Sequence, residues 1–120
     1  MLDYEEKFDK VVLASLAVSE EEQQEAENLV SEDLKAAIRL AKQNIETFHA
    51  ATTPLRARKV QTQPGVTCWQ KAVAIEKVGL YIPGGTAPLF STVLMLAVPA
   101  RIAGCKEIVL CTPPGRDGKV

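Results

Sequence analysis

A proline–glycine–glycine turn at residues 83–85 is the part of the sequence best suited to holding a small ligand. It follows a β-rich segment, residues 78–82, and precedes an apolar stretch with a helical pattern that starts at about Ala87. Pro83 presets a tight turn, and Thr86 is expected to cap the helix. A helix N-terminus behind glycines favours anions. The glycine spacing matches neither a P-loop nor G-x-G-x-x-G, so an ordinary strand-to-helix turn and a ligand loop both stay open.

Residues that could bind a metal or act as nucleophiles are few. The three cysteines, Cys68, Cys105 and Cys111, form no C-x-x-C pair, and His49 is the single histidine. This set predicts no zinc cluster and indicates reduced thiols in a cytoplasmic protein. Because His49 falls close to the apolar stripe of its expected helix, a hydrogen-bonded core or boundary role is favoured over a catalytic one.

Charge is unevenly placed along the chain, although the formal net charge is only −1. The sequence through Asp33 has eleven acidic and two basic residues, and the sequence from Leu34 onward has four acidic and twelve basic ones. The bases are scattered among apolar segments, so we expect a solvated acidic helix and no nucleic-acid partner. Residues 78–100 carry no charge, but their helical part is too short to span a membrane.

Helical patterns dominate the first 51 residues. Residues 1–10 resemble the end of a helix whose beginning is missing, which indicates a truncated chain. Residues 11–18 are expected to form a strand or an extended connector. A capping box at residues 19–22 predicts a helix to about Leu29, and Ser31 is expected to cap the next helix, which runs to about Ala51 with one apolar stripe.

The second half of the sequence predicts β structure around one apolar helix. Residues 55–63 and 66–71 flank a turn and are expected to form an exposed antiparallel arm. The helix from Ala87 is apolar nearly all round and is expected to be buried on several sides, ending at Gly104. Residues 107–111 are the next strand, so residues 78–111 form a βαβ unit in an α/β protein.

The segment VGLYIPGGTAPLFSTVLMLAVPARIAGCKEIVLCTPP closely resembles the corresponding segment of the histidinol dehydrogenase family, and KFDK, NIETFHA and QTQPGV resemble it in the same order. The resemblance implies incomplete Rossmann-like domains related to the aldehyde dehydrogenase architecture. Residues 1–77 would be the truncated helical and β portion of the first domain, and residues 78–120 the start of the second. It also implies a homodimer whose active sites draw on both subunits, NAD and zinc as cofactors, and oxidation of L-histidinol to L-histidine in two hydride transfers.

Only residues on the NAD-binding side of such an active site have counterparts in this sequence. By resemblance, Tyr81 contacts NAD and Pro83 lies on the same wall. By resemblance, the family's zinc ligands and its Glu–His acid/base pair belong to later segments, and His49 matches none of them. We therefore expect no catalytic or metal-binding residue in this sequence. We also expect no activity from the chain alone. Two alternatives stay open: a related dehydrogenase for another amino alcohol or polyol, and a non-catalytic dimerisation or scaffold module.

Overall fold

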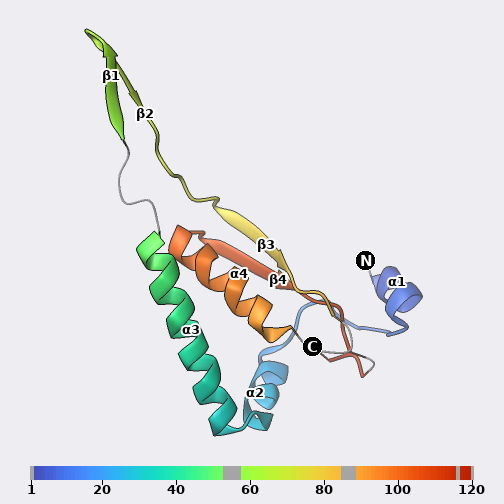
Figure 1. The fold of residues 1–120 in the computed structure, drawn as a ribbon. Coiled ribbons are helices and arrows are strands. Elements are labelled where there is room, and N and C mark those ends of the chain that lie inside the picture. Colours follow the sequence, from blue (N-terminus) through green and yellow to red (C-terminus); the bar gives the residue numbers. More distant parts are fainter. Residues whose placement is uncertain (1, 53–57, 85–88, 116, 120) are drawn as a thin grey trace.

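The structure, a computed structural model, describes residues 2–52, 58–84, 89–115 and 117–119. It contains helices and two small sheets, as expected of an α/β protein (Figure 1). In chain order its elements are α1 (Leu2–Tyr4), η1 (Glu5–Asp9), α2 (Glu20–Leu29), α3 (Glu32–Thr52), β1 (Lys59–Gln63), β2 (Val66–Trp69), β3 (Lys77–Tyr81), α4 (Phe90–Ala103) and β4 (Glu107–Cys111).

The N-terminal helical segment is short and changes from an α-helix to a π-helix. α1 passes directly into the π-helical turn η1, which ends at Lys10 with a positive φ of 62°. Residues 11–18 contain no strand, so the connector reading was the correct one. Val11 is buried and anchors this connector.

Side-chain caps fix where the two long N-terminal helices begin. The Ser19 hydroxyl accepts the N–H of Glu22 at 3.2 Å, and the Glu22 carboxylate accepts the N–H of Ser19 at 2.8 Å. This is the expected capping box, which satisfies two backbone donors at the start of α2. At α3 the Ser31 hydroxyl accepts the N–H of Leu34 at 3.3 Å, which confirms the second expected cap.

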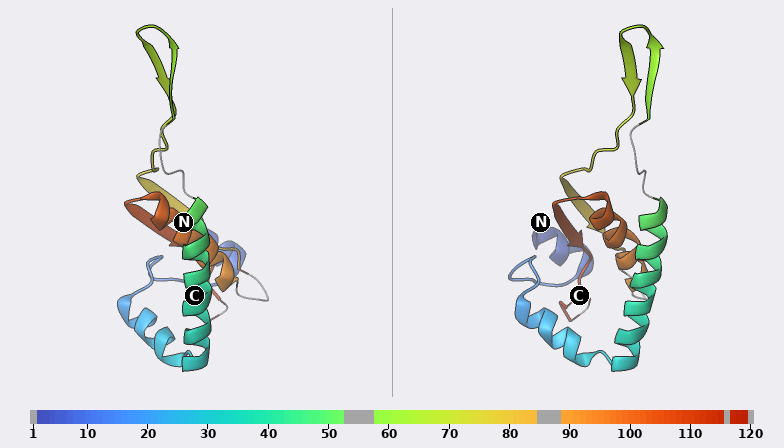
Figure 2. Two further views of the ribbon diagram at one scale, coloured as in Figure 1. Left: turned by 60° about the vertical axis from the view of Figure 1, so that its left-hand side comes forward. Right: turned by 90° about the vertical axis from the view of Figure 1, so that its left-hand side faces the viewer.

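The hairpin β1–β2 extends away from the rest of the chain (Figures 1 and 2). Lys59 pairs with Trp69 and Val60 with Cys68, in the antiparallel arrangement predicted. All the residues of both strands are exposed. Among the described elements, the two strands make their substantial contacts with each other. The arm therefore adds nothing to the core in this structure.

The core lies where α4 covers the parallel pair β3–β4. The register runs from Lys77 opposite Glu107 to Tyr81 opposite Cys111, which confirms the βαβ unit. β3 begins one residue earlier than expected, because Lys77 joins the ladder and its Nζ lies 2.7 Å from a Glu107 carboxylate oxygen. Residues that pack between the pair and α4 are buried: Leu80, Ile82 and Val98.

Helix α4 differs from the expectation in two ways. It begins at Phe90 after Leu89, which makes no side-chain cap, and the expected start at Ala87 with Thr86 as cap lies outside the described residues. The prediction that α4 is buried on several sides was wrong. It packs on α3 and β3, yet Val98 is its only buried residue among those described, because the elements present do not surround it. Gly104 ends it with a φ of 89°, as predicted.

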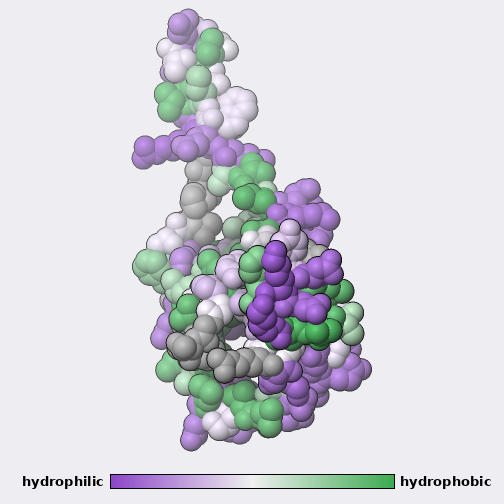
Figure 3. Space-filling view, turned by 90° about the vertical axis from the view of Figure 1, so that its right-hand side faces the viewer, coloured by the Kyte–Doolittle hydropathy of each residue, from purple (hydrophilic) through white to green (hydrophobic). Residues whose placement is uncertain are grey.

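The molecule is elongated and open. Its principal dimensions are 66 × 38 × 25 Å and its radius of gyration is 19.9 Å, against about 14 Å for a compact domain of this length. Figure 3 shows hydrophobic side chains spread over the face it presents, below a hydrophilic band where the arm meets the body. None of the helices in the described ranges has both the length and the apolar character needed to cross a bilayer.

We expect the open side of α4 to bind a dye for apolar surfaces and to promote self-association. Phe90 is 57% and Met95 51% exposed, which leaves apolar area of α4 in water. Replacing both Phe90 and Met95 with Ser should lower the dye fluorescence of the purified chain, while Gln23→Ser, an exposed polar site on α2, serves as the control. A chain that sediments as a stable monomer and binds no dye would contradict this expectation.

The first turn of α3 should be acid-sensitive through Glu32. The hydrogen bond from Lys35 Nζ at 2.9 Å, and then the Lys35 charge, hold the pKa of Glu32 below its ordinary value. A lowered folded-state pKa stabilises the fold above the ordinary glutamate pKa, and this contribution is lost as the pH falls through the lowered value. An NMR titration should therefore give Glu32 a low midpoint that Lys35→Gln raises and Lys42→Gln leaves unchanged. An ordinary midpoint in the unmodified chain would rule the interaction out.

Candidate functional site

An open cleft of about 930 Å³ lies at the carboxyl ends of β3 and β4. The residues that follow each strand form its walls, and the first turn of α4 forms one side. Open α/β sheets bind ligands at this edge, because the loops that leave parallel strands diverge there. The parallel arrangement of β3 and β4 therefore makes this edge of the sheet the candidate site.

The structure brings both residues expected to contact the cofactor into this cleft. Tyr81 ends β3 and is 63% exposed, and Pro83 follows two residues later on the same wall. Cys111 lies opposite Tyr81 in the strand register, and its carbonyl accepts the N–H of Ile82 at 2.8 Å. The ladder therefore extends to the rim and fixes the backbone on both sides of Tyr81.

Gly84 lets the two loops that leave the strands touch. A Cβ atom added at Gly84 would lie 2.5 Å from Cγ of Pro113, which is closer than side chains approach each other. The position therefore requires glycine for close approach, and its φ is not in the left-handed region. The contact sets the width of the cleft between the loop after β3 and the loop after β4.

Charged groups from distant parts of the chain complete the rim. Partial burial, and then the neighbouring Asp9 carboxyl, raise the pKa of Glu5, whose Oε2 is shielded from solvent. Across the cleft, Lys119 donates to the Glu25 carboxylate at 2.9 Å, and this bond raises the pKa of Lys119. No sequence pattern predicts that Glu5, Asp9 and Lys119 line the cleft, because they approach β3 only through tertiary packing.

The chemistry that the cleft can support is binding and orientation. Its wall is apolar at Ile82, Val93 and Leu110, with the Tyr81 phenol as a polar group beside them. A planar ring could lie against such a wall. Cys111 could have been anticipated from the sequence, since it ends the parallel partner of β3 and so must face the same edge.

The described residues do not provide a set of side chains suited to binding a zinc ion. Among the described residues no three His, Cys, Asp or Glu side chains are grouped as metal ligands. Cys105 and Cys111 are at opposite ends of β4, and Cys68 is on the arm. The donors present therefore do not fit a tetrahedral zinc centre.

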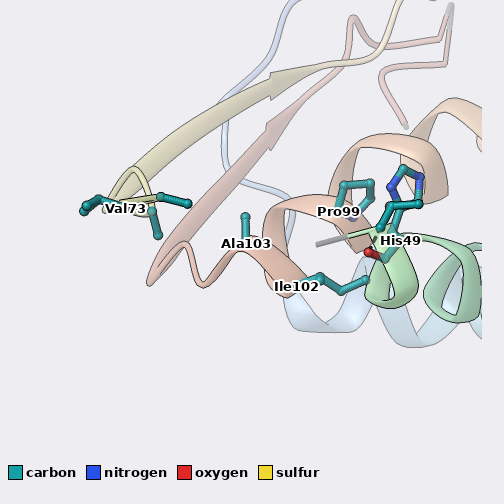
Figure 4. Close-up of a pocket in the computed structure, with 8 residues that line it drawn as sticks. His49, Val73, Pro99, Ile102 and Ala103 are labelled. Carbon is teal, nitrogen blue, oxygen red and sulfur yellow. Dashed lines mark hydrogen bonds between the residues drawn. The ribbon is translucent and has the colours of Figure 1, made fainter. Parts of the chain in front are cut away.

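His49 lies in a separate, smaller cavity of about 370 Å³, away from the cleft. The cavity is formed by the last turns of α3 and α4 and by residues 72–74, and Figure 4 shows His49 near Pro99. The ring is half-buried and meets the Phe48 ring edge-on at 5.4 Å between centroids. This is a boundary position between two packed helices, in line with the structural role expected for it.

Gly84→Ala should destabilise the chain, whereas Gly79→Ala should not. The added methyl group at Gly84 would force Pro113 to move, at a cost of about 1–3 kcal/mol. A methyl group at Gly79 in β3 would meet nothing within 4 Å, and alanine there should stabilise the strand by about 0.5–1 kcal/mol. Urea unfolding followed by circular dichroism measures both free energies. Equal effects of the two substitutions would refute the close approach at Gly84.

Comparison with known proteins identifies relatives of this chain. The family profile described as Histidinol dehydrogenase matches residues 1–120. Histidinol dehydrogenase of Bacteroides thetaiotaomicron is 68% identical over the whole chain, and that of Escherichia coli O157:H7 is 57% identical over 93% of it. The crystal structure of histidinol dehydrogenase from Elizabethkingia anophelis matches with a TM-score of 0.92 and 50% identity over 99% of the chain.

These matches concern one part of the relatives. The chain spans 28% of the length of the Bacteroides thetaiotaomicron protein and 27% of the crystallised chain. Within that part, the sequence profile and the fold agree from one end of the chain to the other. The chain therefore belongs to the histidinol dehydrogenase family.

Proposed function

We propose that this chain is part of a zinc- and NAD-dependent oxidoreductase that converts L-histidinol to L-histidine, and that it supplies one wall of the NAD site. The observation that carries the proposal is the cleft at the carboxyl ends of β3 and β4, with Tyr81 and Pro83 on its wall. NAD, when bound, accepts hydride, and oxidation from the alcohol to the acid level takes two such transfers.

The residues of this chain would position the cofactor. The Tyr81 hydroxyl can bond a polar group of NAD while its ring provides a flat surface, and Pro83 gives that wall a fixed backbone. Ile82 and Leu110 provide apolar cover that excludes water from one side of the ligand. The contact between Gly84 and Pro113 would keep the two loops at a constant separation.

The proposal assigns the zinc ion and the proton transfer to parts of the protein outside residues 1–120. The donors among the described residues do not fit zinc, and His49 lies in a cavity away from the cleft. Residues 1–120 alone would therefore be inactive with L-histidinol. The working protein would be a cytoplasmic homodimer, with a domain boundary near residue 77, and a reading frame that continues past Val120 would support it.

Tyr81→Phe in the longer protein that we propose should weaken NAD binding and leave the zinc content unchanged. Loss of one hydrogen bond predicts a dissociation constant about 2- to 10-fold higher, measured by calorimetry, with zinc measured by atomic absorption. Tyr4→Phe is the control, because Tyr4 stacks on Phe8 with 5.9 Å between the ring centroids and does not line the cleft. Unchanged NAD affinity in Tyr81→Phe would remove Tyr81 from the site.

A further inference from the structure

One wall of the cleft is formed by the loop that follows β4, and this loop is held by two separate parts of the chain. Its described residues, 112–115 and 117–119, are called the β4 loop here, and most of them line the cleft. Near its start, Pro113 meets Gly84 in the loop after β3. At its end it lies beside the N-terminal part of the chain (Figure 1).

The end of the β4 loop is a turn closed by its own hydrogen bonds. The N–H of Gly115 donates to the carbonyl of Lys119 at 2.6 Å, and the N–H of Gly118 donates to the carbonyl of Gly115 at 3.0 Å. The Asp117 carboxylate accepts the N–H of Lys119 at 3.2 Å. Gly118 has a φ of 78°, a conformation that favours glycine. Because these bonds tie the two ends of the turn together, the turn is expected to move as a unit.

An apolar contact joins this turn to the connector between η1 and α2. A Cβ atom added at Gly118 would lie 3.5 Å from Cγ1 of Val11 and 3.5 Å from Cδ2 of Leu13, so the turn rests directly on these side chains. Val11 is 8% exposed and is one of four buried apolar side chains among the described residues. Burial of this side chain favours the arrangement in which connector and turn stay together.

A charged contact joins the same turn to α2. The Nζ atom of Lys119 donates to a carboxylate oxygen of Glu25 at 2.9 Å, although the two residues are 94 positions apart. Both side chains are more than half exposed, so the pair contributes modestly by itself. Together with the contact at Val11, it defines where the turn lies relative to the N-terminal segment.

The position of this turn is transmitted to the narrow part of the cleft. Pro113 and Pro114 precede the turn, and each proline ring fixes its own φ, so this stretch of backbone is stiff. A displacement of the turn would therefore also displace Pro113, whose contact with Gly84 sets the separation of the two loops. The N-terminal segment is thus connected to the cleft through a short, rigid stretch of chain.

We propose that Val11 and Glu25 are positioning residues for the cofactor cleft. Acting through Gly118 and Lys119, they hold the β4 loop at the distance from the β3 side that fits NAD. The inference rests on the function proposed above and adds residues far from the cofactor to it. Neither Val11 nor Glu25 is among the residues that line the cleft, so their effect would pass through the loop.

Glu25→Gln in the longer protein separates this role from a direct contact of Lys119 with NAD. Lys119 lines the cleft, so a direct bond to a phosphate of NAD would strengthen when Glu25 no longer competes for the ammonium group. Positioning predicts the opposite, a dissociation constant for NAD about 2- to 5-fold higher by calorimetry. Glu27→Gln removes the same charge from α2 and should have no effect, because Lys119 bonds Glu25 rather than Glu27.

Exchanging the two charges provides a rescue. Glu25→Lys combined with Lys119→Glu restores an ion pair with opposite polarity and should recover most of the NAD affinity that either single change removes. The same double variant places a carboxylate where the cleft had an ammonium group. A direct contact of Lys119 with the cofactor would therefore leave the double variant as weak as Lys119→Glu alone, and that result would overturn the inference.

Val11→Ala tests the apolar contact. It should raise KM for NAD at least about twofold and leave kcat at saturating NAD and the zinc content unchanged. A purely structural loss would instead lower the amount of active protein, which reduces kcat and leaves KM as it was. Val98→Ala is the control, because Val98 is 5% exposed in α4 and does not line the cleft. It should lower the urea midpoint and leave KM for NAD unchanged.

Hydrogen exchange without NAD provides a readout that does not depend on the cofactor. Amides of residues 112–119 should exchange faster in Val11→Ala and Glu25→Gln than in the two control variants, because the turn is then less firmly held. Unchanged exchange in this segment, or tighter NAD binding by Glu25→Gln, would overturn the inference. If the longer protein binds NAD and responds to Tyr81→Phe alone, the inference fails and the proposed function stands. If it binds no NAD, both fail.

Discussion

The parallel pairing of β3 with β4 is the constraint on which the rest of this structure depends. A parallel pair cannot be closed by a tight turn, so the chain must cross over between the strands, and α4 makes that crossing. The crossing buries Leu80 and Ile82 against α4 and aims both strand ends in one direction. The cleft exists because the two loops leave from the same edge, and Gly84 lets them stay in contact there.

Around this pair, the molecule has an open cleft at one edge of the sheet and an uneven distribution of charge between its two ends. The N-terminal helices carry most of the acids, while the arm and the C-terminal half carry most of the bases. Short-range pairs such as Lys42–Glu46 neutralise little of this separation, since they join residues within one helix. The open surface of α4 and the uncovered arm have a common cause, because the elements present form too few layers to enclose them.

Local rules in the sequence predicted most of the elements. The caps at Ser19 and Ser31, the turn of the arm, the stop at Gly104 and strand β4 each follow from side-chain chemistry within a few residues, and each is confirmed. The burial of α4 was predicted wrongly. The apolar composition of a helix indicates that burial would stabilise it, but it does not indicate which elements are present to cover it. The sequence predicted only the residues on the β3 side of the cleft, Tyr81 and Pro83. Glu5 and Lys119 come from opposite ends of the chain, and no local pattern predicts that meeting.

The contacts of residues 115–119 have a consequence for the order of assembly. Both strand pairings here are closed by short stretches of chain, β1 to β2 across a turn and β3 to β4 across one crossover, while α3 packs on α4 from beyond the hairpin. Gly118 against Val11 and Leu13, and Lys119 bound to Glu25, instead span nearly the whole chain. Loop-closure entropy makes such distant contacts the slow ones. During synthesis, then, the hairpin and the βαβ unit can form as they emerge, and the mouth of the cleft takes its shape after them.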